Sequence, residues 1–391
     1  MADVYEGAAI TLAATWSSSS KDGCFASPIH DIALSERGLY SRDDPEKFPH
    51  RASNRNVLND TWPLFKRAWV YQERRLSVCV LHFGKQQLYW ECNSRLGSEN
   101  DLEGRDPDSS DLKSSEIETN PEAEWRNVVK QYSRLMLTHE KDRLPAISAC
   151  VGRMQRLRKN DVYIAGMWKT TLRHDLQWYI VDLIPPARPN RPGLMIPSWS
   201  WISTSSGVFH DDTSIPLLSL DDIDIAYNIT GPAHIGQVSH AELHLKARFI
   251  FLKPVLRGKS SPSSFEHPHG IWENYGIFLT SCMGQWDFDY TTADPHIHAN
   301  ETFVALLLSR SDRSHFDLLY FGLVLRELAS KRFERVGHVH IGLQFESESE
   351  AELDSESESE AEPELEPVSE PEVKPEWPFF LRLPIGEFTI V

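Results

Sequence analysis

A short charged segment groups the residues that are best placed to do chemistry. Gln72 and Glu73 lie beside Arg67, Arg74 and Arg75 in a stretch with helical spacing of its apolar residues. Guanidinium groups near a carboxylate would place it in a basic, partly buried setting, where its pKa can differ from that of a surface acid. A Glu among arginines on a helix is more often a paired structural charge. Glu73 is therefore a candidate catalytic carboxylate and, more simply, a candidate ion-pair partner.

Four tryptophans are candidates for core anchors or for a stacking surface. They are Trp69, Trp90, Trp199 and Trp201. An indole brings a large apolar area and one N–H donor that needs a partner, which favours a role in the core. If the segment Pro-Ser-Trp-Ser-Trp is a strand, Trp199 and Trp201 point to the same face. They would then form a wedge between a helical region and a β region.

Histidines and cysteines give no defined metal or disulfide site. Imidazoles two residues apart can share one face of a strand, but both such pairs lie in Pro-containing segments without a cysteine cluster, namely His267 with His269 and His296 with His298. Surface loops and no metal are expected there. The cysteines are odd in number and scattered, so they define no disulfide framework: Cys24, Cys79, Cys92, Cys150 and Cys282. A Glu next to Cys92 would raise the pKa of that thiol, which argues against a Cys/His catalytic pair.

The common catalytic motifs are missing from the sequence. It contains no GxxxxGK[ST] loop, GxGxxG turn, GxSxG elbow or HExxH helix. Nucleotide hydrolysis, serine hydrolysis and zinc proteolysis therefore have no sequence support, and no cofactor is expected.

The net charge of -17 comes mostly from one acidic run. Residues 346–372 hold 12 Glu and one Asp, and removing these thirteen from the 57 acidic residues leaves 44 against 40 basic ones. The rest of the chain is thus nearly neutral, which predicts no nucleic-acid partner. No apolar stretch reaches the roughly 18 residues of a membrane span, and no secretory leader is recognisable. A soluble cytoplasmic protein with reduced thiols is expected.

The N-terminal half is expected to be mainly helical around one β-hairpin. The hairpin is predicted from Val78 to Trp90, with a turn at Gly84 and Lys85. Residues 93–120 are polar and charged, which is typical of a linker. Helices are predicted for Val4–Trp16, Trp62–Leu76, Glu122–Leu137, Asp142–Arg158 and Tyr163–Ile180.

The C-terminal half is expected to be mainly β. A change to proline and arginine at Pro185–Pro192 predicts a domain boundary, after which short alternating runs are typical of antiparallel strands up to residue 345. The acidic residues 346–376 have almost no apolar side chains and are expected to be disordered, either as a spacer or as a substrate of acidophilic kinases. Residues 377–391 are apolar again and predict a final strand.

The segment from Arg67 to Cys92 resembles the signature near the end of the fungal heterokaryon-incompatibility (HET) domain. The sequence is RAWVYQERRLSVCVLHFGKQQLYWEC, with Ala68 where the family usually has glycine. The matching positions are Arg67, Trp69, Gln72, Glu73, Leu76, Ser77, Tyr89, Trp90, Glu91 and Cys92. DVYEGAAITLAA near the start, IPSWSWIS with Trp199 and Trp201, and FERVGHVHI further on resemble other landmarks of the family. The family's Leu-Ser-Tyr-x-Trp-Gly strand has no counterpart, so a sheet edge is expected to be uncovered.

The resemblance implies a role in self/non-self recognition and cell death, through contacts with protein partners. Some descriptions of the family liken it to Toll/interleukin-receptor domains, in which a helical glutamate serves NAD cleavage, and Glu73 would take that role. An NAD-directed hydrolase completed by missing or partner residues and a degenerate inactive relative are therefore alternatives to a non-enzymatic module. The oligomeric state is not indicated.

The expected fold is α+β, with a helical HET-derived N-terminal region and a mainly antiparallel C-terminal region. The expected organisation is residues 1–92 as the C-terminal part of a HET-like domain, 93–120 as a polar linker, 121–184 as a helical region, 185–345 as a β-rich region, 346–376 as an acidic insert and 377–391 as a terminal strand.

Overall fold

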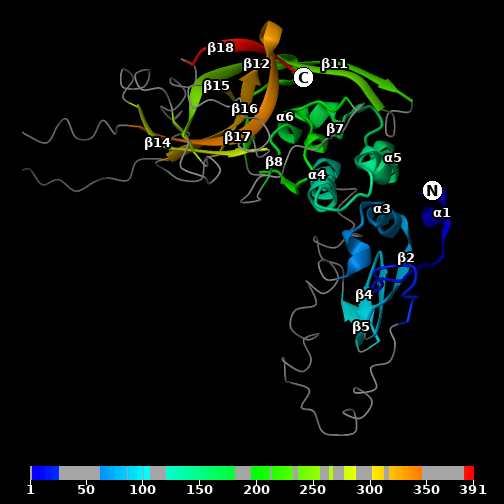
Figure 1. Ribbon diagram of the computed structural model, residues 1–391. Coiled ribbons are helices and arrows are strands. Elements are labelled where there is room, and N and C mark those ends of the chain that lie inside the picture. Colours follow the sequence, from blue (N-terminus) through cyan, green and yellow to red (C-terminus); the bar gives the residue numbers. More distant parts are fainter. Residues whose placement is uncertain are drawn as a thin grey trace, which may run out of the picture.

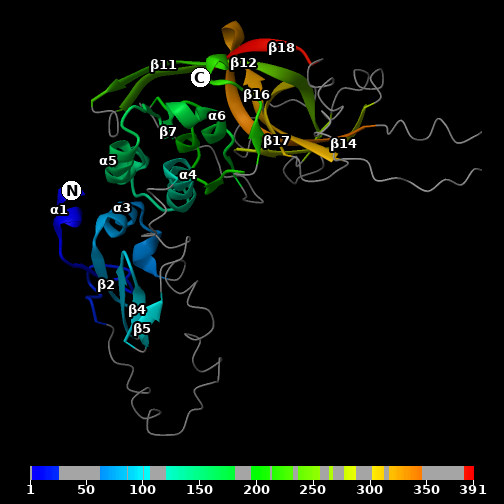
Figure 2. The same ribbon diagram turned by 180° about the vertical axis from the view of Figure 1, so that it is seen from behind.

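A computed structural model gives the fold of the chain, which has mixed α and β content and a mostly β C-terminal region (Figure 1). A five-stranded sheet lies at one end of the molecule and a nine-stranded sheet at the other, with α4, α5 and α6 between them (Figures 1 and 2). The structure describes residues 2–25, 62–85, 87–99, 101–105, 120–180, 195–211, 214–231, 237–255, 264–266, 277–287, 302–311, 317–345 and 383–391.

The N-terminal part is a five-stranded sheet with one covering helix. Its strands follow the order β1-β2-β3-β4-β5, in which β1 is parallel to β2 and the other neighbours are antiparallel. The predicted hairpin is confirmed as β2 and β3. The elements are α1 (Ala2–Gly7), β1 (Thr11–Ala13), the 3-10 helix η1 (Pro63–Lys66), α3 (Ala68–Leu76), β2 (Cys79–Phe83), β3 (Leu88–Cys92), β4 (Leu96–Ser98) and β5 (Asp101–Arg105).

Two expectations for this part are wrong. The helix predicted for Val4–Trp16 stops at Gly7, and the apolar residues after it form the edge strand β1. The polar stretch 93–120 is not a plain linker, because β4 and β5 extend the hairpin into the sheet. These strands are short, and β4 contains Gly97, whose missing side chain leaves room for the Trp90 ring. The sequence did not indicate them because β4 has only three residues and β5 is an edge strand with charged side chains.

The middle of the chain contains two substantial helices. α4 begins at the cap Asn120, whose side chain accepts from the N–H of Ala123, with Pro121 at its first position. The predicted helix over Asp142–Arg158 is confirmed for its second half. The elements are α4 (Pro121–Tyr132), η3 (Glu140–Asp142), η4 (Pro145–Ile147), α5 (Ser148–Leu157), β6 (Tyr163–Ile164), β7 (Met167–Trp168), η5 (Lys169–Thr171), α6 (Leu172–Asp175), β8 (Tyr179–Ile180), η6 (Trp201–Ser203) and β9 (Val208–Phe209).

The helix predicted for Tyr163–Ile180 is wrong. The chain instead makes the tight β6–β7 hairpin, whose turn residues Ala165 and Gly166 have φ values of 46° and 91°. A helix cannot pass through such a turn, and glycine adopts a positive φ without strain. Both strands are buried on all sides, so their continuous apolar run imitated helical spacing.

The C-terminal part is a nine-stranded sheet, as the mainly antiparallel expectation for this region predicts. The long strand β12 pairs with both β13 and β15, so the sheet closes on itself. The predicted terminal strand is confirmed as β18, which is antiparallel to β12 and parallel to the start of β17. The strands are β10 (Ile215–Pro216), β11 (Ile223–Thr230), β12 (Gln237–Val255), β13 (Ser264–Glu266), β14 (Ile277–Trp286), β15 (Phe303–Ser311), β16 (Asp317–Glu327), β17 (Arg332–Phe345) and β18 (Ile385–Ile390), with the 3-10 turns η7 (Leu220–Asp222) and η9 (Ala329–Lys331).

One apolar core runs from α3 through the middle segment into the closed sheet. Trp125, Trp168, Trp178, Trp199 and Trp201 are all fully buried in it. The predicted strand at Pro-Ser-Trp-Ser-Trp is a turn followed by η6, yet both indoles occupy the core between the helices and the sheet. The proposed boundary at Pro185–Pro192, both His pairs and the acidic residues 346–376 lie outside the described residues.

Two indoles converge on one carbonyl oxygen in this core. Nε1 of Trp125 and Nε1 of Trp201 donate to the carbonyl oxygen of Gly166, at 3.0 and 2.8 Å. A Cβ at Gly166 would lie 2.6 Å from Trp201 Nε1. Both the backbone conformation and the packing therefore require glycine at this position.

Replacement of this glycine should be costly, whereas the same change in a helix should not. Gly166→Ala is expected to lower the free energy of unfolding by at least about 1–3 kcal/mol, because it combines a positive φ with a clash. The matched control Gly152→Ala lies in α5 with open space around the new methyl group, and should raise stability by about 0.5–1 kcal/mol. Urea unfolding of the three proteins measures both changes. Equal stability of Gly166→Ala and the parent would contradict the tight turn.

Candidate functional site

The signature segment folds as a helix packed on a hairpin. Alternate residues of β2 and β3 point towards α3 and η1, and Val80 and Glu91 are buried on that side. A small second core of Trp62, Phe65, Val70 and Leu96 fills the space between them. The helix and the hairpin thus form one unit, although the twelve residues 77–88 separate α3 from the Tyr-Trp-Glu-Cys end of the signature.

A buried carboxylate joins the two halves. Glu91 Oε2 lies 2.6 Å from Arg74 Nε and 3.0 Å from His82 Nε2, and all three side chains are buried. Burial alone would raise the pKa of Glu91, but the charge of Arg74 and the hydrogen bond from His82 hold it well below its usual range. The lowered pKa of Glu91 therefore contributes stability that is complete at neutral pH and is lost progressively as the pH falls below the ordinary pKa of a glutamate.

The network continues to the turn that follows the edge strand β1. His82 Nδ1 lies 3.2 Å from the hydroxyl of Thr15, which also donates to the carbonyl oxygen of Ala13. Thr15 and His82 are both completely buried. A carboxylate, an imidazole and a hydroxyl in sequence are the groups of an acyl-transfer triad, but burial closes them to a substrate, so their role here is structural.

Two further contacts fasten α3 to the middle of the molecule. Arg75 forms a buried ion pair with Glu124 of α4. Gln72 accepts from the N–H of Ala149, at the start of α5, at 3.1 Å. The charged residues of the signature thus bind in opposite directions, Arg74 towards the hairpin and Arg75 towards the helices.

Glu73 is not the carboxylate that Arg74 and Arg75 bind. It is half-buried beneath α1, and burial raises its pKa against the opposing effects of a hydrogen bond from the Tyr5 hydroxyl and the charge of Arg67. A carboxyl group that takes up a proton more readily than usual is one property of a general acid.

The remaining signature residues serve the packing of this unit. Leu76 is buried, and Ser77 ends α3 by donating its hydroxyl to the carbonyl oxygen of Glu73. Trp69 is partly buried and its Nε1 lies 3.4 Å from Asp142 Oδ2. Tyr89, Trp90 and Cys92 are partly exposed on β3, whereas Trp199 and Trp201 lie far along the chain in the main core.

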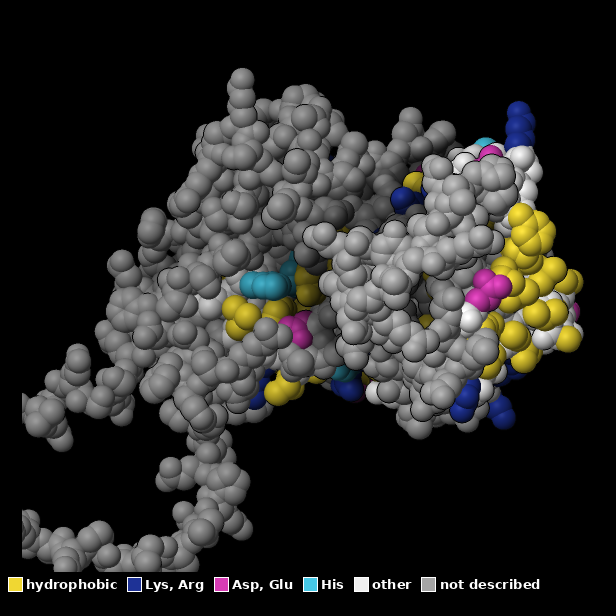
Figure 3. Space-filling model, turned by 90° about the horizontal axis from the view of Figure 1, so that it is seen from below, with side chains coloured by type: hydrophobic (Ala, Val, Ile, Leu, Met, Phe, Trp, Pro, Cys, Tyr) yellow, Lys and Arg dark blue, Asp and Glu magenta, His cyan; other side chains and the backbone are white. Residues whose placement is uncertain are grey.

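The opposite face of the five-stranded sheet is apolar and open. The register places Leu12, Leu81 and Trp90 side by side across three strands, pointing away from α3. Leu12 is 63% exposed and Ile10, next on the same face of the edge, is 51% exposed. Hydrophobic side chains gather on the side of the molecule where β1 and β2 lie (Figure 3). We call Ile10, Leu12, Leu81 and Trp90 the open face.

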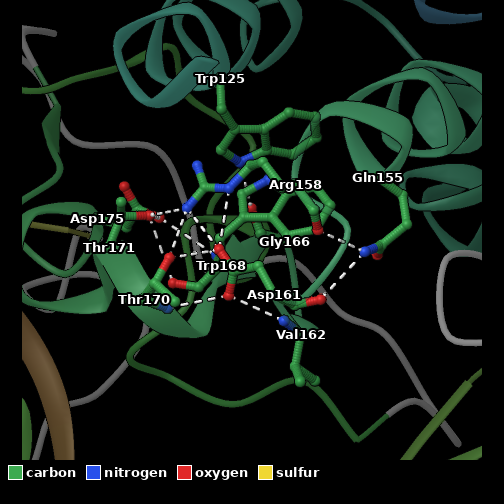
Figure 4. Close-up of polar contacts among 10 residues, drawn as sticks. All are labelled: Trp125, Gln155, Arg158, Asp161, Val162, Gly166, Trp168, Thr170, Thr171 and Asp175. Atoms are coloured by element: carbon green, nitrogen blue, oxygen red, sulfur yellow. Dashed lines mark hydrogen bonds and ion pairs between the residues drawn. The ribbon is translucent and has the colours of Figure 1, made fainter. Parts of the chain in front are cut away.

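A second polar cluster, which sequence reasoning missed, lies in the middle segment (Figure 4). Arg158 pairs with Asp161 at 2.6 Å, donates to the hydroxyls of Thr170 and Thr171, and lies over the ring of Trp168. An Arg and an Asp three residues apart at a helix end are common on surfaces, so the spacing alone carried no signal. Only the β6–β7 hairpin brings the two threonines to them.

A buried acid adjoins this cluster. Asp175 Oδ2 accepts from the N–H of Trp168 and from the hydroxyl of Thr171, whereas Oδ1 has no hydrogen-bond partner. Burial raises the pKa of Asp175 to about 6 in spite of these bonds and of the nearby Arg158. The group fixes the turn after β7 and faces the protein interior, so it is a structural acid without access for a substrate.

Metal and membrane sites find no support in the described residues. Within the described ranges, no three His, Cys, Asp or Glu side chains are grouped closely enough to hold a metal ion. No described helix is long and apolar enough to cross a membrane.

No family model matches the chain, and no curated protein and no solved structure matches it either.

Loss of the central carboxylate should be far more costly than loss of a surface one. Glu91→Gln is expected to lower the free energy of unfolding by about 3–5 kcal/mol, because it leaves Arg74 charged and buried without its counter-ion. The matched control Glu6→Gln removes the partner of Arg156 in an exposed pair and should cost less than about 1 kcal/mol. Chemical denaturation at pH 7 measures both. Similar losses for the two variants would exclude the buried pair as the link between α3 and the hairpin.

Proposed function

We propose that this chain is a heterokaryon-incompatibility module of the fungal type, which acts in self/non-self recognition and cell-death signalling through protein contacts. The resemblance of the signature segment supports this role, together with landmarks on both sides of it. The observation that carries the proposal is the open face, because it is built on the signature hairpin itself.

The distribution of charge and apolar surface fits a contact module better than an open catalytic site. Arg74 and Glu91 are paired with each other inside the unit, and Arg75 is paired with Glu124 of α4. The apolar side chains of Ile10 and Leu12 are instead exposed on its surface. Contiguous exposed apolar surface on a folded protein is typical of an interaction site. The partner is a protein that covers this surface.

The proposal predicts that growth inhibition depends on the open face. Expression of the chain in a filamentous fungal host is expected to reduce viability, and Leu12→Asp is expected to restore it, because a carboxylate there would have to be desolvated at the contact. The matched control Val162→Asp changes a residue that is 53% exposed and lies outside the sheet. It should leave the inhibition unchanged. Colony growth and viable staining measure the effect at equal protein levels, checked by immunoblotting.

The outcomes separate the proposal from its alternatives. Inhibition that persists in Leu12→Asp would contradict the open face as the contact surface. Growth equal to that of the empty vector for all variants would favour a degenerate, inactive relative.

Glu73 supports a second candidate function, an NAD-directed hydrolase. Its raised pKa and its position beside Arg67 and Tyr5 are the observations that favour this alternative. The contact proposal expects no consumption of NAD by the purified chain, alone or in cells that express it. NAD turnover that is lost in Glu73→Gln, followed by chromatography of the products, would favour the enzyme instead.

A further inference from the structure

Two cysteines that are separated along the chain lie opposite each other in the signature hairpin. Cys79 is the first residue of β2 and Cys92 the last of β3, and the register makes them direct cross-strand partners. Residues opposite one another in a ladder point to the same face. Both thiols lie on the side of the open face, in the row next to Leu81 and Trp90, and both are partly exposed.

The backbone hydrogen bonds show that this is the closer kind of cross-strand pair. The N–H of Cys92 donates to the carbonyl oxygen of Arg95, on the β4 side of β3. The N–H and C=O of one strand residue point to the same side, so Cys92 and Cys79 exchange no backbone hydrogen bonds. In such pairs the Cα atoms are about 4.5 Å apart and the side chains approach each other. A disulfide needs Cα atoms roughly 4.4–6.8 Å apart.

Both thiols of the pair are partly exposed and therefore accessible to a small reagent. Cys92 Sγ lies 3.5 Å from the hydroxyl of Ser94, which can donate to a thiolate. The neighbouring Glu91 carboxylate points to the opposite face and is paired with Arg74. Cys150 differs, because burial raises the pKa of its thiol to about 11 and closes it to reagents.

We propose that Cys79 and Cys92 are a redox-modification site that forms a reversible disulfide between β2 and β3. The oxidant is a small disulfide of the glutathione class. The Cys92 thiolate attacks one sulfur of the oxidant, which gives a mixed disulfide and releases one small thiol. Cys79 then attacks the Cys92 sulfur and releases the second small thiol. Two cysteine thiols and one disulfide thus become one protein disulfide and two small thiols, with electrons and protons balanced.

The disulfide would link β2 to β3 at the end of the hairpin that adjoins α3. Cys79 follows the end of the helix by three residues, and Cys92 follows Glu91, which holds Arg74. Oxidation therefore closes the hairpin covalently at the end where no turn joins its strands. Since the link restricts the unfolded chain, the oxidised form should melt at a higher temperature. The inference is independent of the proposed function.

Peptide mapping of the full-length chain tests the proposal. The purified protein is equilibrated with reduced and oxidised glutathione in varied ratio, blocked with iodoacetamide, unfolded and digested with trypsin. Cleavage after Arg75, Lys85 and Arg95 separates the two cysteines into peptides 76–85 and 86–95. The expected result is a reduction-sensitive linked pair of these peptides that forms from the native protein and disappears in Cys92→Ser. The matched control Cys24→Ser changes an exposed thiol. This variant should still form the linked peptide pair, and its Tm should still rise on oxidation.

Three results would overturn the proposal. The first is a native protein that accumulates only mixed disulfides with glutathione at Cys79 or Cys92. The second is a link that forms only after unfolding in urea, and the third is a link from either residue to Cys24.

Discussion

The burial of one charge determines how the N-terminal part is built. A carboxylate taken out of water is tolerated only with partners, and Glu91 has Arg74 from the helix and His82 from the neighbouring strand. These contacts set α3 against one face of the hairpin. The same helix uses Arg75 and Gln72 to bind α4 and α5. Because α3 covers only one face of the sheet, the face that carries Leu12 and Leu81 is left uncovered by it.

A second buried charge, that of Arg335, is paired in a similar way at the opposite end of the molecule. This fully buried side chain pairs with Asp287 at 2.8 Å, donates to the carbonyl oxygens of Leu176 and Trp178, and lies 3.4 Å above the Trp178 ring. It thereby fastens β17 to the middle segment. The indoles of Trp125 and Trp201, which meet at the carbonyl oxygen of Gly166, hold the middle segment together.

Sequence reasoning succeeded where a local pattern determined the structure and failed where distant contacts did. The β2–β3 hairpin, α4 and β18 were predictable because strand alternation, helical spacing of apolar residues and a terminal apolar run each have one simple solution. The β6–β7 hairpin was not, because complete burial removes the polar face that distinguishes a strand from a helix. At the site, the basic setting was foreseen for Glu73, but Arg74 binds Glu91, seventeen residues further along the chain. Sequence proximity could not indicate that pairing.

The central claim is that the five-stranded sheet has a closed, charge-containing face and an open apolar face. Hydroxyl-radical footprinting of the purified chain, read by mass spectrometry, tests it most directly on two residues of the same type in the same sheet. Leu12 is 63% exposed and Leu96 is 8% exposed. The account predicts that Leu12 is oxidised several times faster than Leu96, as exposure determines the access of the radical. Equal rates at Leu12 and Leu96 would contradict the open face.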